Sequence, residues 1–164
     1  MLNQWREKIA REIADLDREL RVDLPKEIRR AVELGDLSEN AEYAAALERQ
    51  EFIRARLSHL ERRLAEIGRL SPRDIPEDRI ALGSSVSLEF DSGERAQFLL
   101  VLPELVEEGN GSVSIGSPIG RALLGKVAGS RVSIELPEGP REARVRSFES
   151  LHALAARARS APGA

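Results

Sequence analysis

Four acidic residues stand close together in a segment that contains no basic residue. They are Glu33, Asp36, Glu39 and Glu42, and no Lys or Arg occurs from 31 to 45. Two carboxylates about one helical turn apart can share a hard cation such as Mg²⁺, which accepts one or two carboxylates and keeps several waters. They can also orient a water for attack on a phosphodiester. Asp36 and Glu39 have this spacing, but two carboxylates are too few for a tight site without a partner that already holds a metal.

The same residues also have an ordinary structural explanation. Gly35 suits the left-handed position just after a helix, and Asp36 with Glu39 three residues later would form a capping box. Judged only by the preferences of residues at helix ends, a turn between two helices explains Gly35, Asp36 and Glu39. However, capping needs only one or two acids, and the mutual repulsion of four costs stability. Asp36, Glu39 and Tyr43 would also lie near one face of the second helix.

The flanking segments predict a long antiparallel hairpin of two helices, over residues 1–70. Apolar residues recur in steps of three and four from Leu2 to Leu34 and again from Leu37 to Arg69, which is typical of a coiled-coil seam. Pro25 is expected to kink or interrupt the first arm. Each arm would reach about 50 Å at ~1.5 Å per residue. The pairing would bring together Leu16, Leu20, Ile53 and Leu57.

The period changes after residue 70. A linker is expected over 71–79, which contains Pro72 and Pro76. Alternation with period two then predicts a small sheet domain over 80–151, with one helix or wide loop near 117–130. A flexible tail is expected over 152–164. The fold class is therefore α+β.

Composition and charge exclude several classes of protein. The net charge is −3 and the pI about 5.6, whereas general nucleic-acid binding favours a pI above about 9. There is no cysteine, which excludes disulfides and cysteine-ligated zinc. The N-terminus lacks the apolar region of a signal peptide, and no stretch approaches the ~18 apolar residues of a membrane span. We therefore expect a soluble, cytoplasmic protein that does not enter a membrane.

Two motifs resemble those of a known family. The segment "GDLSENAEY" resembles the G-D-L-x-E-N-A-E-Y signature of the bacterial transcript cleavage factors GreA and GreB. In the second half, "SPIGRALLGK" resembles that family's S-P-I-x-R-A-L-[IL]-G-K. The resemblance implies a coiled-coil hairpin that enters the secondary channel of bacterial RNA polymerase, and an FKBP-like sheet domain that docks on the channel rim.

The resemblance also implies roles for individual residues. Asp36 and Glu39 match the family's two catalytic carboxylates, which stabilise a second Mg²⁺ held jointly with the polymerase and position the attacking water. Backtracked RNA is then cut by the polymerase's own active site, so the factor is not itself an enzyme, and the free protein is expected to bind no metal. We expect a monomer. Residues expected to support the tip are Asn40, Glu42 and Tyr43.

Two further sets of residues are assigned to partners. Ser117, Pro118, Ile119 and Leu123 are expected to contact polymerase, some of them sharing that segment with core residues. Arg49, Arg54 and Arg56, together with Arg29 and Arg30, could steer the 3′ end of the nascent RNA through its phosphates. The alternative for these arginines is that they solvate the outer face of the hairpin and pair with Glu27, Glu48 and Glu51.

Other functions remain open. A homologue with the same fold could block the secondary channel and coordinate metal without cleavage, although the D-x-x-E spacing favours cleavage. An FKBP-like fold also suggests a prolyl isomerase. Such a pocket is lined by aromatic side chains, and the second half has only Phe90, Phe98 and Phe148. A purely structural coiled-coil adaptor would not explain an acidic tip without compensating charge.

Overall fold

The chain forms two compact units in the computed structural model, which describes residues 1–37 and 39–160. One unit is Leu2–Leu70, and the other runs from Ser71 onward together with Met1. Within the described residues, no helix is long and apolar enough to cross a membrane.

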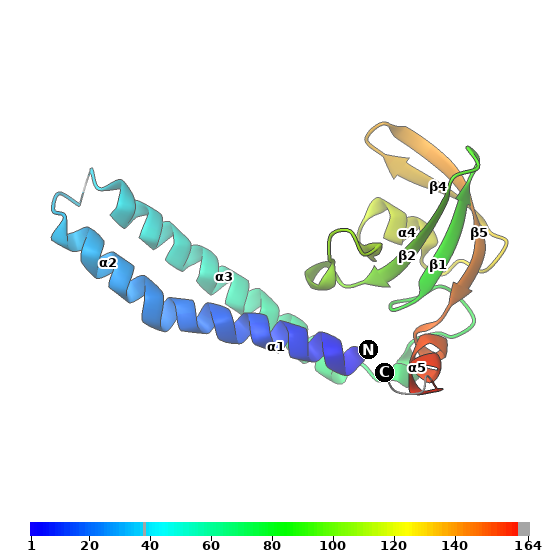
Figure 1. The fold of residues 1–164 in the computed structure, drawn as a ribbon, viewed down its shortest axis with the longest axis horizontal. Helices are drawn as coiled ribbons and strands as arrows, with labels where there is room; N and C mark the ends of the chain where they lie inside the picture. The colour runs from blue at the N-terminus through cyan, green and yellow to red at the C-terminus, as the bar shows by residue number, and fades with distance from the viewer. Residues whose placement is uncertain (38, 161–164) are drawn as a thin grey trace. The chain divides into compact units, whose positions relative to one another are not determined.

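The first unit is the predicted helical hairpin (Figure 1). Its first arm consists of α1 (Leu2–Arg18), a π-helical turn η1 (Glu19–Asp23) and α2 (Leu24–Glu33), and its second arm is α3 (Ala41–Arg69). The core is one narrow seam between the arms, as the apolar spacing predicted. One cluster along it contains Leu24, Ala46, Ile53 and Leu57, with Ile13, Leu16, Leu20 and Ile28 packed against them; Ile9, Leu60 and Ile67 are also buried.

Pro25 interrupts the first arm without breaking it. Proline has no amide hydrogen and its ring clashes with the carbonyl four residues earlier, so an unbroken α-helix cannot pass through this position. The chain instead widens into the π-helical turn Glu19–Asp23, and α2 begins at Leu24, one residue before Pro25. A π-turn inserts one residue into the helical ladder. The arm therefore continues beyond Pro25, with Leu24 1% exposed on the seam.

The second unit is a curled sheet of five strands (Figure 1). The strands are β1 (Ser85–Phe90), β2 (Arg95–Val101), β3 (Ser112–Ser114), β4 (Arg131–Leu136) and β5 (Gly139–Glu149). Their order is β3-β2-β1-β5-β4; β3 pairs with β2 in parallel and the other pairs are antiparallel. Two short 3₁₀ turns are η2 (Pro72–Asp74) and η3 (Pro103–Leu105).

Alternation along the strands places one face of the sheet in the core. On β1, Val86, Leu88 and Phe90 are buried while the residues between them are partly exposed, which is the period of two that the sequence predicted. The helix α4 (Pro118–Leu123) packs against β4 and adds the fully buried Leu123 to this core. The predicted α+β architecture is therefore confirmed.

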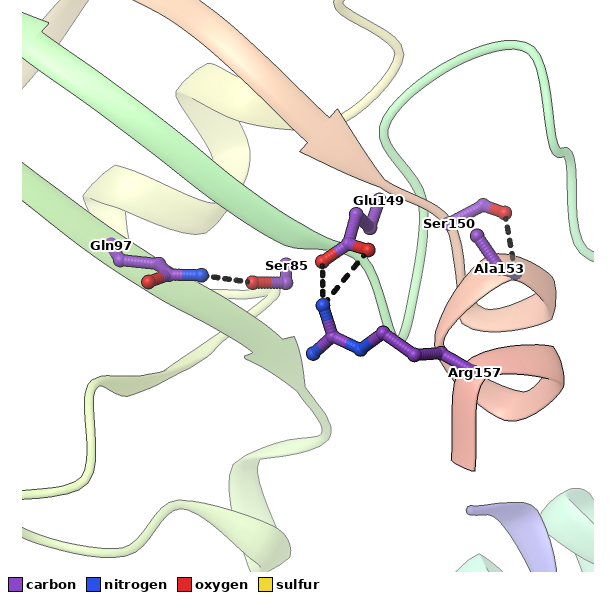
Figure 2. A network of polar contacts seen from close by, with 6 residues as sticks. All are labelled: Ser85, Gln97, Glu149, Ser150, Ala153 and Arg157. Carbon is purple, nitrogen blue, oxygen red and sulfur yellow. Dashed lines mark hydrogen bonds and ion pairs between the residues drawn. The ribbon is translucent and has the colours of Figure 1, made fainter. Parts of the chain in front are cut away.

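The prediction of a flexible tail over 152–164 is wrong for residues 152–160, which form most of the helix α5 (Leu151–Ser160). Residues 161–164 lie outside the described part of the chain. Figure 2 shows how α5 is attached: Ser150 Oγ accepts a hydrogen bond from Ala153 N, and Arg157 donates to both carboxylate oxygens of Glu149. Leu151 is 4% exposed. Capping, an ion pair and one buried leucine thus order a segment whose composition is small and basic.

Candidate functional site

The acidic segment forms the loop between α2 and α3, at one end of the hairpin (Figure 1). The amide of Gly35 donates to the carbonyl oxygen of Val32 at 3.1 Å, and Gly35 has φ +78°. This is the left-handed glycine expected just after a helix, a conformation that costs other residues about 1 kcal/mol or more. The first half of the predicted turn is therefore confirmed.

The predicted capping box is wrong, because α3 begins at Ala41 and its N-cap is Asn40. Asn40 Oδ1 accepts a hydrogen bond from Tyr43 N at 3.0 Å. Asp36 instead has φ +29°, a conformation that Asp and Asn adopt more readily than most residues. Since Asn and Asp are about equally good N-caps, local rules could not choose between the two positions.

Asp36 and Glu39 consequently lie in the loop before α3. The prediction that they lie on one face of the second helix is wrong. The amide of Glu39 donates to the carbonyl oxygen of Asp36 at 3.3 Å, so the two residues begin and end a single four-residue turn. Both are exposed. No group of three or more His, Cys, Asp or Glu in the described residues could hold a metal. The two carboxylates are hard oxygen ligands of the kind that Mg²⁺ prefers. They are too few to form a complete metal-binding site by themselves.

The residues expected to support the tip differ in their roles. Asn40 Nδ2 donates to the carbonyl oxygen of Ala31 at 2.7 Å and of Gly35 at 3.2 Å, in addition to capping α3. Tyr43 is half-buried, whereas Glu42 is exposed. Glu42 lines a cavity of about 370 Å³ between α2 and α3 with Arg30 and Arg49 among its neighbours. Asn40 is thus the residue that joins the two helix ends to the loop.

Three of the five arginines assigned to RNA, on α3, are engaged by acidic side chains of the hairpin. Arg49 donates to both carboxylate oxygens of Glu19 at 2.6 and 2.8 Å, and Arg56 donates to Glu12 at 2.7 Å. These two pairs link the arms. Arg54 pairs with Glu51 at 2.7 Å, as the alternative explanation expected.

The ion pair between Arg49 and Glu19 should make the stability of the hairpin decrease at acidic pH. Hydrogen bonds donated by Arg49 hold the pKa of Glu19 below its ordinary value of 4.5. A lowered folded-state pKa contributes stability that is present above the unfolded pKa and lost as the pH falls through the folded one. We expect the thermal midpoint of the wild type to fall more steeply below pH 4.5 than that of Glu19→Gln. Melting followed by the fluorescence of Trp5 would show this, and parallel pH profiles would contradict it.

The residues expected to contact polymerase divide into core and surface. Ser117 is the N-cap of α4: its hydroxyl accepts from Gly120 N at 3.0 Å and donates to the carbonyl oxygen of Ser114 at 2.7 Å. Pro118 is exposed and Ile119 half-buried. Leu123 is 0% exposed, so the assignment of its side chain to a docking surface is wrong. The neighbouring Leu124, which follows the last residue of α4 and is not helical, is 37% exposed.

Comparison with known proteins agrees with the order of the two units. Residues 2–67 match the family model described as "Transcription elongation factor, N-terminal", and residues 75–150 match "Transcription elongation factor, GreA/GreB, C-term". A relative in Thermodesulfovibrio yellowstonii, named transcription elongation factor GreA, is 40% identical over 127 residues, which are 75% of this chain and 80% of the relative. The chain belongs to the GreA/GreB family. Members of this family are cofactors of the RNA cleavage activity of RNA polymerase and are not enzymes themselves.

Other relatives cover still more of the chain. A protein of Helicobacter hepaticus, also named transcription elongation factor GreA, is 39% identical over 143 residues, or 87% of this chain and 88% of the relative. Among solved structures, GreA factor homolog 1 of Thermus thermophilus aligns with 28% identity and a TM-score of 0.40 over 88% of this chain and 94% of that chain. The helix α5, at Leu151–Ser160, lies beyond the residues that the GreA/GreB C-terminal model matches.

Proposed function

We propose that this protein inserts its hairpin into the secondary channel of RNA polymerase and stimulates cleavage of backtracked RNA by the polymerase active site. The observation that carries the proposal is the placement of Asp36 and Glu39, exposed in one turn at the end of the hairpin. With 29 residues, α3 is about 43 Å long at ~1.5 Å per residue, so the loop can reach deep into a partner.

The charge of the loop supports a role beside a cation. No Lys or Arg occurs from 31 to 45, so the repulsion among the four acids is not offset within the segment. Asp36 and Glu39 would hold a Mg²⁺ jointly with carboxylates of the polymerase, and Asp36 or Glu39 would orient the attacking water. When bound, such an ion supplies Lewis-acid stabilisation of charge at the phosphodiester. We place this activity in the cytoplasm, where the polymerase acts.

The sheet domain would hold the factor on the polymerase through the outer side of the segment around α4. Pro118, Leu124 and Val127 are exposed there, and exposed apolar side chains grouped in this way are typical of docking surfaces. The buried Leu123 supports this surface from within the core.

A second candidate is a channel inhibitor that occupies the same place without promoting cleavage. Incubating the wild type with a stalled, backtracked elongation complex separates the two. A cleavage factor releases short 3′ RNA fragments and restores elongation. An inhibitor slows synthesis and releases none, and that result would refute the proposal.

Of the five arginines assigned to RNA, we infer that Arg29 and Arg30 contact it. Within the described part of the chain, Arg29 and Arg30 make no hydrogen bond or ion pair and both are exposed, whereas Arg49, Arg54 and Arg56 are engaged by acids. We expect the double change Arg29→Gln and Arg30→Gln to weaken cleavage by about 3- to 10-fold, because two phosphate-contacting charges are lost.

Salt and a matched variant test this assignment. Since phosphate contacts release counterions, the wild type should lose more activity than the double variant between 50 and 200 mM salt, the range over which such contacts weaken strongly. Arg54→Gln removes one charge from an exposed ion pair and should change cleavage by less than about 2-fold. If Arg54→Gln reduced cleavage more than the double variant does, the arginines of α3, and not Arg29 and Arg30, would contact the RNA.

A further inference from the structure

We propose that Asn40 is a positioning residue for the two carboxylates of the loop, a conclusion that rests on the proposed function. Its side-chain amide makes three hydrogen bonds: Oδ1 accepts from Tyr43 N at 3.0 Å, and Nδ2 donates to the carbonyl oxygens of Ala31 at 2.7 Å and Gly35 at 3.2 Å. One side chain therefore joins the end of α2, the loop and the start of α3.

Two of these bonds go to backbone groups at helix ends, where amides and carbonyls lack the regular partner within the helix. They are the amide of Tyr43 in the first turn of α3 and the carbonyl of Ala31 in the last turn of α2, which also accepts from Leu34 N at 3.2 Å. Ala31 lies in the last turn of α2 and is 1% exposed, so water reaches it poorly. A side-chain amide offers two donors and an acceptor, and Asn40 uses all of them. Asp could cap α3 equally well but could not donate to either carbonyl.

The bonds of Asn40 close the loop that carries the acids. The loop begins at Gly35, whose carbonyl Asn40 holds, and ends at Asn40 itself. Within it, the amide of Glu39 donates to the carbonyl oxygen of Asp36. Both acidic side chains are exposed, so their positions depend on the backbone of this turn. Because catalysis is sensitive to displacements of about 1 Å, a loop released at one end would misplace both carboxylates.

The decisive variant is Asn40→Asp. It keeps the acceptor that caps α3, removes both donated bonds and places a carboxylate beside the Ala31 carbonyl. We expect the cleavage rate at saturating factor to fall by about 10- to 100-fold, while the factor concentration that gives half of that rate changes by less than about 2-fold. The control is Ala55→Gly, at an exposed position in the middle of α3. It weakens the helix by about 1 kcal/mol without touching the loop and should change neither quantity.

A second measurement does not depend on cleavage. In the full-length free protein, backbone NMR order parameters at Leu37 and Glu39 should drop below about 0.6 in Asn40→Asp and stay near the wild-type value in Ala55→Gly. If the wild type does not stimulate cleavage but the order parameters behave as expected, the proposed function fails and the ordering role stands. Unchanged order parameters in Asn40→Asp would overturn the inference whatever the activity. So would an equal loss of cleavage in both variants, or a rise in the half-saturating concentration alone.

Discussion

Removing either carboxylate of the loop is expected to reduce RNA cleavage by RNA polymerase by at least about 100-fold, the usual effect of losing one preorganised electrostatic group at a reaction centre. The changes are Asp36→Asn and Glu39→Gln. Each retains the size and one acceptor oxygen of the side chain and removes its charge. A carboxylate that helps to hold Mg²⁺ cannot be replaced by an amide without weakening that ligand. Cleavage on a stalled elongation complex would be timed at saturating factor.

In the structure, these substitutions disturb the helix end less than the sequence predicted. Asp36 is not the cap of α3, so its replacement does not remove a cap, and Asn tolerates its φ of +29°. Glu33→Gln and Glu42→Gln are matched controls, since each removes one charge from the same segment outside the loop turn. We expect these controls to stay within about 3-fold of the wild type. If all four variants lost activity alike, total negative charge and not the loop pair would be responsible.

The arms of the hairpin could be predicted because their signal is repeated many times. Every third or fourth residue of both arms contributes to one seam, and a single misassigned position leaves the rest intact. Leu16, Leu20, Ile53 and Leu57 indeed meet in the core of the hairpin. Alternation on β1 has the same redundancy, with Val86, Leu88 and Phe90 all facing the core.

The acidic charge of the tip could be predicted from the sequence, but its geometry could not. The acidic charge and the missing basic residues are properties of composition, and they do not depend on where a helix starts. The start itself depends on a single hydrogen bond, and both Asp36 and Asn40 are good caps. What favours Asn40 is its contact with Ala31, nine residues earlier. Local rules do not include a bond from the end of one helix to the start of the next.

The two remaining errors have the same origin. Leu123 and Leu124 are chemically identical neighbours, and only the packing of α4 on β4 decides that the first is buried and the second exposed. The segment of α5 is small and basic, and it is ordered by partners outside itself. Arg157 pairs with Glu149 on β5, and His152 Nε2 lies 3.0 Å from the carbonyl oxygen of Ile75. Such tertiary contacts produce no periodic pattern in the sequence from which they could be predicted.

The adjacent residues Phe52 and Ile53 test whether the narrow seam holds the hairpin together. Ile53 is 0% exposed and Phe52 is 56% exposed. We expect Ile53→Ala to lower the free energy of unfolding of the hairpin by about 3 kcal/mol, through lost burial and a cavity in the seam. Phe52→Ala removes a larger side chain, yet it should cost no more than about 1 kcal/mol, because more than half of its surface is exposed and its ring lies beside the guanidinium of Arg49, 5.3 Å from its centroid.

Urea unfolding followed by tryptophan fluorescence measures this in the full chain. Trp5 is the one tryptophan of the sequence and is a buried residue of α1, so its signal reports on the unfolding of the first arm. A two-helix hairpin has no second layer to compensate for a cavity, and a domain of ordinary stability has only about 5–15 kcal/mol to lose. The loss at Ile53 should therefore also reduce cleavage at 37 °C, by letting the arm that carries the loop unfold. Equal destabilisation by the two variants would mean that the outer surface of α3, and not the seam, holds the arms together.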